Sequence, residues 1–195
     1  MVENIRNLVF VGLSIHLIGI VFYIKEILRG NIKPNKLTWL LWAISPLIAT
    51  AAAISDGVRL SILPTFMAGF GPLIVFITSF MNKDAYWELG KFDYLCGFFS
   101  ALALILWGIT KEPSIAIAFL IVSDGFAAVP TLIKAWKHPE TENAAPYLAE
   151  IFSALTSFAA IEVWNFSSAA FPTYLVILDT LLALSIYKGR IFKWK

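Results

Sequence analysis

The chain has 195 residues, of which 59% are hydrophobic and only 14% are charged. A soluble domain carries about 25% charged residues, so this composition excludes an ordinary water-soluble protein and indicates a surface that faces lipid. The formal net charge of +2 gives no reason to expect a nucleic-acid partner. Cys96 is the only cysteine, which excludes an intrachain disulfide and a cysteine metal cluster.

Long apolar runs follow one another along the chain, separated by short charged or Pro/Gly-bearing stretches. A run of about 20 apolar residues spans a bilayer as a helix, and continuous rather than alternating hydrophobicity favours helices over barrel strands. The start "MVENIRN" carries both charge signs and no clear cleavage site follows, so we expect a membrane helix here and not a secretory signal. We predict an all-α membrane protein with seven transmembrane helices over residues 8–24, 37–54, 61–81, 92–109, 114–133, 146–163 and 169–187.

The basic residues of the predicted connections are distributed unevenly, and this bias predicts the orientation. Of the 15 Lys and Arg, only Arg6, Arg59 and Lys111 lie on the side of the N-terminus. All the others lie on the opposite side, which we expect to be cytoplasmic because basic loops stay inside. We therefore expect an external N-terminus, a cytoplasmic C-terminus, and location in the plasma (inner) membrane of a prokaryote.

Two distant stretches of the chain match in one register. Placing residues 35–78 on residues 143–186 without a gap aligns Asn35 with Asn143, and the pair Pro64-Thr65 with Pro172-Thr173. One further residue of offset places "FYIKEI" on "TLIKAW" with their lysines matched. The alternative is a set of unrelated helices with similar hydropathy.

The matches predict that the first three helices resemble the last three, with the fourth helix as a connector. Three helices reverse the chain and the fourth reverses it again, so both repeats would run the same way across the membrane. Parallel repeats about an axis normal to the bilayer are a transporter design with the substrate near the midplane. We expect residues 1–82 to form the first repeat, 83–112 the linker helix, and 113–195 the second repeat with a basic tail.

The segment "VPTLIKAWKHPETENAAPY", residues 129–147, resembles the PQ-loop segment of the SWEET, SemiSWEET and PQ-loop transporter superfamily. The resemblance implies the three-one-three arrangement with the N-terminus outside. This chain departs from the motif, because Pro130-Thr131 lacks the glutamine and the first repeat has Val21-Phe22 at that point. Of the four prolines that sugar-transporting members carry, Pro46 and Pro130 are present, and we expect both to act as hinges.

Ionisable side chains at membrane depth are costly and usually face the bundle interior, so each one is a candidate site residue. Four lie well inside the predicted helices, away from their ends: His16, Asp124, Glu150 and Asp179. The repeat register places Asp179 on Gly71 and Glu150 on Trp42, so charges of the second repeat would oppose an apolar wall of the first.

The functional interpretation is that Asp124 and Asp179 line a central cavity with His16, where they bind hydroxyl or amino groups or carry a proton. The alternative for Asp124 is a structural hydrogen bond with Ser123 or His16. We also include Glu150, Trp42 and Gly71 in the candidate site. Trp39 has a simpler explanation as a membrane-interface residue.

These observations predict a small-solute transporter that works by alternating access between the repeats. The expected solute is a sugar or another small polar or amino-type molecule, and coupling of its transport to protons is one alternative. The alternative is a receptor-like or vitamin-handling membrane protein of the same architecture without sugar transport. We expect no enzyme activity, metal or cofactor, since the only histidines, His16 and His138, lie far apart in helix depth. The expected partners are a small-molecule substrate and the lipid bilayer, and assembly into a homo-oligomer stays open.

Overall fold

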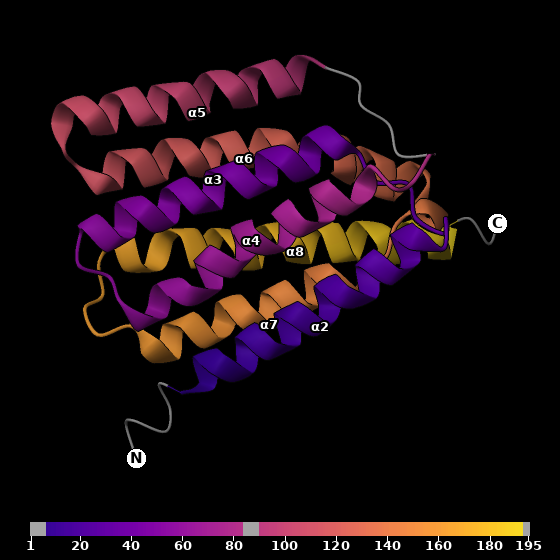
Figure 1. Ribbon diagram of the computed structural model, residues 1–195, viewed down its shortest axis with the longest axis horizontal. Helices are drawn as coiled ribbons and strands as arrows, with labels where there is room; N and C mark the ends of the chain where they lie inside the picture. Colours follow the sequence, from indigo (N-terminus) through magenta and orange to yellow (C-terminus); the bar gives the residue numbers. More distant parts are fainter. Residues whose placement is uncertain (1–6, 84–89, 193–195) are drawn as a thin grey trace.

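The computed structural model describes residues 7–83 and 90–192, and these residues form helices and connections without a strand. Seven α-helices and two short 3-10 turns follow one another along the described chain (Figure 1). Their bounds are α2 Leu8–Leu28, α3 Lys36–Ser55, η1 Leu60–Ile62, α4 Leu63–Ser79, α5 Lys91–Thr110, α6 Pro113–Lys137, η2 Pro139–Thr141, α7 Ala145–Ala160 and α8 Phe166–Phe192.

The helix positions agree with the seven predicted runs, but several ends differ. Helices α2 and α6 continue beyond the apolar runs and carry Lys25, Lys134 and Lys137 in their last turns. Basic residues near a helix C-terminus interact favourably with the helix dipole, so the helices continue past the point where hydropathy falls. The expectation of seven membrane spans is met in part, because five helical segments are long and apolar enough to cross a bilayer: Leu8–Leu28, Lys36–Ser55, Leu60–Ser79, Pro113–Lys137 and Phe166–Lys188.

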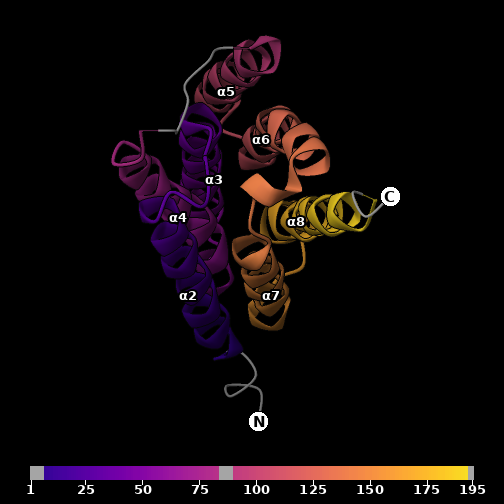
Figure 2. The same cartoon turned by 90° about the vertical axis from the view of Figure 1, so that its right-hand side faces the viewer.

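Two rows of three helices lie face to face (Figure 2). One row, which we call the first layer, contains α2, α4 and α3, with α4 in contact with both of the others. The second layer contains α6, α8 and α7, with α8 in contact with both of the others. In each layer the third helix along the chain therefore lies between the first and the second.

The layers meet through two main pairs of helices, α2 against α7 and α3 against α6. Helix α5 lies outside the two rows and packs mainly on α6 (Figure 2). Ser123 on α6 anchors this contact: its Oγ donates to the Cys96 carbonyl at 3.0 Å and lies 2.5 Å from the Ser100 Oγ. The helix that connects the layers along the chain is thus peripheral to their interface.

The two asparagines matched by the sequence register play the same structural role. The Asn35 side chain accepts a hydrogen bond from the Leu37 backbone N–H at 3.0 Å, at the start of α3. The Asn143 side chain accepts one from the Ala145 backbone N–H at 2.8 Å, at the start of α7. Each satisfies a backbone donor that a helix N-terminus leaves without an intrahelical partner.

The Pro-Thr pairs are less equivalent than the sequence suggested. Pro64 lies in the first turn of α4, whereas Pro172 lies inside α8. Helix α8 begins earlier because the Asn165 side chain accepts from the Ser168 N–H at 2.9 Å and starts the helix there. The corresponding entry to α4 passes instead through Gly57, with φ of +82°, and the 3-10 turn η1. The two matched Pro-Thr pairs therefore lie at different distances from the beginnings of their helices, α4 and α8.

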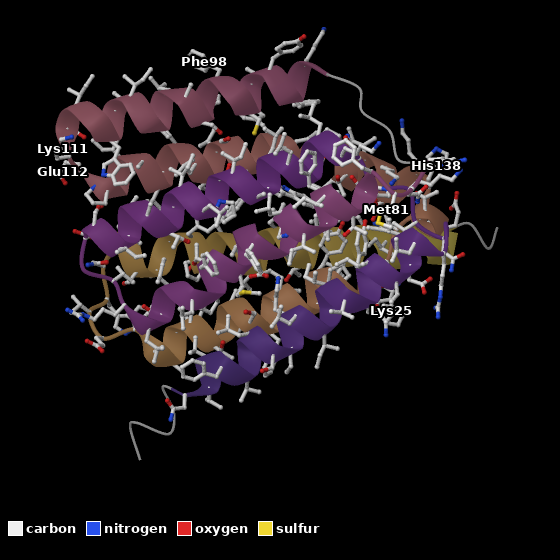
Figure 3. The ribbon with its side chains drawn as sticks, in the orientation of Figure 1. Lys25, Met81, Phe98, Lys111, Glu112 and His138 are labelled. Atoms are coloured by element: carbon white, nitrogen blue, oxygen red, sulfur yellow. The ribbon has the colours of Figure 1, made fainter. Side chains whose placement is uncertain are left out.

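The charged connections lie at the two ends of the bundle (Figure 3). Lys25 and His138 lie at one end, whereas Lys111 and Glu112 lie at the other. We call the first of these the basic end and define it by Lys25, Lys33, Lys36 and Lys134. Between the ends the lateral surface is apolar, with residues such as Phe98 on α5 exposed to 60%. This is the surface that a protein embedded in lipid presents.

Glycines allow α2 to approach α7 closely. A Cβ added at Gly19 would lie 2.6 Å from the Ala149 Cβ and 3.3 Å from the Ala145 carbonyl oxygen. Gly12, two turns earlier, faces Ser153 and Thr156 on α7 with as little room. Small residues of this kind let membrane helices pack backbone to backbone, so α2 and α7 form the tight seam between the layers.

We predict that Gly19→Ala destabilises the protein, because the added methyl group must push α2 from α7. Overpacking of this kind lowers the free energy of unfolding by about 1–3 kcal/mol. The measurement is the thermal unfolding midpoint in detergent, which should fall. The matched control is Gly97→Ala on α5, where an added Cβ meets no atom within 4 Å. An unchanged unfolding midpoint for Gly19→Ala would contradict the tight seam.

Candidate functional site

A cavity lies between the two layers and is lined by residues from all six of their helices. The space open to the centres of water-sized molecules is about 50 Å³. One water needs about 10–15 Å³ by this measure, so the cavity holds a few waters or a very small solute. The first layer contributes His16, Trp39, Trp42 and Pro46 among others, and the second contributes all the carboxyl groups of the lining, Asp124, Glu150 and Asp179.

His16 and Glu150 connect the layers across this cavity. His16 lies near the middle of α2 and Glu150 lies just beyond the first turn of α7, and they are 3% and 5% exposed. The imidazole Nδ1 and the carboxylate Oε2 form a close ion-pair contact. The His16 Nε2 and the Glu150 Oε1 are buried without a hydrogen-bond partner in the described residues, so the contact offsets only part of the cost of burying both groups.

Gly71 leaves the space that His16 needs. A Cβ at position 71 would come within 2.7 Å of the His16 Nε2 and 3.0 Å of the Ile20 side chain. Gly71 does not line the cavity itself, so its contribution to the candidate site is indirect. The residue at the matching place of the second layer, Asp179, does line the cavity. At the two positions aligned by the repeat register, the first layer has a glycine that leaves room for the His16 imidazole, and the second layer has a carboxyl group that lines the cavity.

Asp124 is held by a residue that the sequence analysis did not anticipate. Its Oδ2 accepts a hydrogen bond from the Tyr174 hydroxyl on α8 at 2.9 Å. The two partners considered from sequence are wrong, because Ser123 bonds to α5 and His16 pairs with Glu150. The Asp124 Oδ1 is buried without a hydrogen-bond partner in the described part of the chain.

Asp179 is the carboxyl group with the least visible compensation. It lies within α8, its side chain lines the cavity, and the residue is 6% exposed. Its Oδ2 is buried and has no hydrogen-bond partner among residues 7–83 and 90–192. A buried oxygen of this kind costs free energy unless a proton or a bound group satisfies it. The cavity is where such a group would have to lie.

Aromatic rings form the wall of the cavity toward the basic end. The Trp42 ring lies 5.4 Å from that of Trp39 and 6.2 Å from that of Tyr147, both nearly edge to face. Tyr23 extends the cluster, with its ring 4.9 Å from Trp39. Trp39 is only 4% exposed, so its interpretation as a membrane-interface residue is wrong. The rotation of α3 turns it inward beside Trp42.

Polar bonds seal the cluster at the basic end. Glu142 accepts from the Tyr23 hydroxyl at 3.2 Å and from the Lys134 Nζ at 2.9 Å. The Lys134 Nζ also donates to the Lys33 carbonyl at 2.5 Å. These bonds connect the two layers. Tyr23 lies in α2 and Lys33 in the connection from α2 to α3, which belong to the first layer. Lys134 lies in α6 and Glu142 in the connection from α6 to α7, which belong to the second. We call Tyr23, Lys33, Lys134 and Glu142 the polar lock.

Packed apolar side chains lie on the other side of the cavity. Ala49, Ala52 and Ala154 meet Phe171 and Leu120 in a buried cluster toward the Lys111 end. Small residues on α3 and α7 bring the layers together there. The cavity therefore lies between an aromatic wall with a polar lock and an apolar plug.

The two proposed hinge prolines occupy different surroundings. Pro46 lies inside α3 and lines the cavity, whereas Pro130 lies inside α6 and does not. Each removes a backbone donor from its helix and weakens it locally. Pro72, inside α4, also lines the cavity.

The structure thus brings together His16, Trp42, Asp124, Glu150 and Asp179, the residues expected to surround a central cavity. It adds Trp39, Tyr147 and Tyr174, which sequence reasoning did not assign to the site. One signal was available for two of them, because the repeat register aligns Trp39 with Tyr147. The same register aligns Tyr174 with Phe66, but this match does not indicate that the Tyr174 hydroxyl reaches Asp124.

No group of three or more His, Cys, Asp and Glu residues suited to a metal ion occurs in the described ranges. Comparison with protein-family models, with curated proteins and with solved structures finds no match for the chain.

We predict an energetic coupling between Asp124 and Tyr174. Tyr174→Phe removes the donor of the 2.9 Å bond, and Asp124→Asn changes its acceptor. A double-mutant cycle on the free energy of unfolding should give about 1–2 kcal/mol of coupling. The comparison pair is Asp124→Asn with Tyr187→Phe, which is 44% exposed near the end of α8; equal coupling in both cycles would contradict the assigned bond.

Proposed function

We propose that the protein is a small-solute membrane transporter that exposes the cavity alternately to the two sides of the membrane. The observation that carries this proposal is a small cavity between two similar layers, lined by buried carboxyl oxygens without hydrogen-bond partners. Intramembrane ionisable groups that face a cavity mark solute or proton pathways in membrane proteins.

The arrangement of contacts supports a duplicated origin for the layers. The order α2, α4, α3 in one layer has the same chain sense as α6, α8, α7 in the other. The contact of α2 with α7 pairs the first helix of one repeat with the second helix of the other, and α6 with α3 does the same in reverse. A two-fold rotation along the helix direction exchanges these contacts, as expected for parallel repeats.

The proposal includes the finer architecture of seven membrane spans in a three-one-three arrangement with the basic end in the cytoplasm. The likeness to the SWEET, SemiSWEET and PQ-loop superfamily belongs to the same proposal and rests on the proline-bearing segment 129–147 and on the three-one-three arrangement. The plasma membrane of a prokaryote is the proposed location.

Alternating access requires the layers to part at one end while they stay closed at the other. At the basic end they would part by breaking the polar lock and separating Trp42 from Tyr147. At the Lys111 end they would part through the apolar plug. The cavity lies between these two closures, where a carried solute would be held.

Proton linkage would use the cavity carboxyl groups. A solute or a proton that binds Asp179 gives its buried Oδ2 a hydrogen-bond partner. After release, this oxygen again lacks a partner until another solute or proton binds. Asp124 and Glu150 face the same space from α6 and α7, with His16 opposite. Burial disfavours the charged form of a carboxyl group, so proton uptake offers one way to neutralise the site between solutes.

The test is uptake into proteoliposomes of a panel of sugars, amino acids and amines, with and without an inward proton gradient. We expect saturable uptake of a small solute, increased by the gradient, and a loss of at least about tenfold in gradient-driven uptake for Asp179→Asn. Glu112→Gln, at the exposed Lys111 end, is the control and should retain uptake. Gradient-independent uptake that survives Asp179→Asn would remove the proton linkage, and no uptake of any solute would favour the receptor-like alternative.

We also predict that Glu142→Gln opens the basic end, because it removes the charge that holds Lys134. Cys96→Ala removes the only native thiol, and Ala68→Cys then places a reporter thiol in the cavity wall. Labelling of this thiol in detergent should become about tenfold faster, the effect of losing one charge-assisted bond. Glu140→Gln changes an exposed carboxylate of the same connection and should not alter the rate; equal labelling in all three proteins would show that the polar lock does not control access.

A further inference from the structure

We propose that the cavity binds a small organic ammonium ion without a carboxylate, held by Asp124 and Asp179 and covered by the Trp42 indole. This inference names the substrate class of the transporter proposed above and rests on that proposal for its physiological meaning. The binding step itself is testable without transport.

The available hydrogen-bonding atoms favour a ligand that donates. The Asp124 Oδ1 and the Asp179 Oδ2 are buried, lack hydrogen-bond partners in the described chain, and belong to side chains that line the cavity. An ammonium group offers several donors and no acceptor, so it can satisfy both oxygens at once. Charge-assisted hydrogen bonds of this type are about twice as strong as neutral ones.

The charge balance of the lining excludes anionic groups. Among the described residues, no Lys or Arg lines the cavity, and its one imidazole, His16, is already in contact with Glu150. A ligand carboxylate would therefore face Asp124 and Asp179 without a cation to pair with. An ammonium ion instead replaces the proton that these carboxyl groups would otherwise need. Amino acids and organic acids are disfavoured on this ground.

Trp42 supplies two further features that suit an organic ammonium ion. Trp42 lines the cavity and is 6% exposed, and the face of an indole attracts a cation at close range. Its Nε1–H is buried without a hydrogen-bond partner in the described residues. A neutral acceptor on the ligand, such as a hydroxyl group, would satisfy that donor. The site therefore suits an amino alcohol better than a plain alkylamine.

The size of the cavity limits the ligand. With about 50 Å³ open to the centres of water-sized molecules, the cavity accommodates roughly three to five heavy atoms on the measure used for water. Ethanolammonium has two carbons, one ammonium nitrogen and one hydroxyl oxygen, and so matches both the volume and the donors and acceptors. A hexose would require the layers to separate.

The experiment measures binding of radiolabelled ethanolammonium to the full-length protein in detergent by scintillation proximity. Unlabelled ethanolammonium, ethylene glycol and glycine serve as competitors of similar size. They differ in one respect each, because ethylene glycol replaces the ammonium by a hydroxyl and glycine replaces the hydroxymethyl by a carboxylate. We expect ethanolammonium to compete at least about tenfold better than either, because ethylene glycol loses a charge-assisted bond and glycine brings a carboxylate to face Asp124 and Asp179.

Variants locate the site independently of the competitors. Asp179→Asn and Asp124→Asn should each weaken binding by about tenfold or more, whereas the exposed control Glu112→Gln should bind like the parent protein. Size-exclusion profiles verify folding, and the competition on the parent protein stands even where a variant misfolds. Equal competition by ethylene glycol, tighter binding of glycine, or no ethanolammonium binding by the folded protein would each overturn the inference.

The result separates this inference from the proposed function. Ethanolammonium binding without uptake into proteoliposomes would keep the ligand class and remove the transporter. Uptake of neutral solutes by a protein that does not bind ethanolammonium would keep the transporter and remove the ligand class.

Discussion

The contact between His16 on α2 and Glu150 on α7 imposes a condition that the rest of the interior has to meet. Both side chains lie deep in an apolar bundle, where an uncompensated charge is costly, and they belong to different layers. The layers must therefore stay close at this depth. Gly19 allows the backbones to approach, and Gly71 leaves space for the imidazole. The small volume of the cavity follows from the same spacing.

The sequence alone was sufficient to find those interior residues whose type is rare within an apolar helix. A carboxyl group within an apolar run stands out, so Asp124, Glu150 and Asp179 could be found without coordinates, and hydropathy located all seven helices. The rotation of each helix could not be found in this way. A helix that is apolar on every face has no amphipathic pattern that separates its lipid side from its interior. For that reason Trp39 was assigned to the interface and Tyr174 was overlooked, although both contact the site.

The two layers share a frame but differ in chemistry at matched positions. Asn35 and Asn143 start equivalent helices with equivalent hydrogen bonds, so the frame is repeated down to single side chains. At and beside the cavity, in contrast, Trp42 matches Glu150, and Gly71, which lies behind the His16 imidazole, matches Asp179. One layer supplies rings and space, and the other supplies carboxyl groups. An asymmetric ligand, charged at one end and uncharged at the other, fits such a cavity in a single orientation.

Helix α7 has 16 residues and so measures about 24 Å at the usual rise per residue. The hydrocarbon layer of a bilayer is about 30 Å thick, and a short helix is accommodated by local thinning of the membrane. In the proposed seven-span arrangement this deformation would act on the helix that carries Glu150 and forms the tight seam with α2. The chain length of the surrounding lipids would then affect the cavity, because thicker membranes would strain the seam and thinner ones would relieve it.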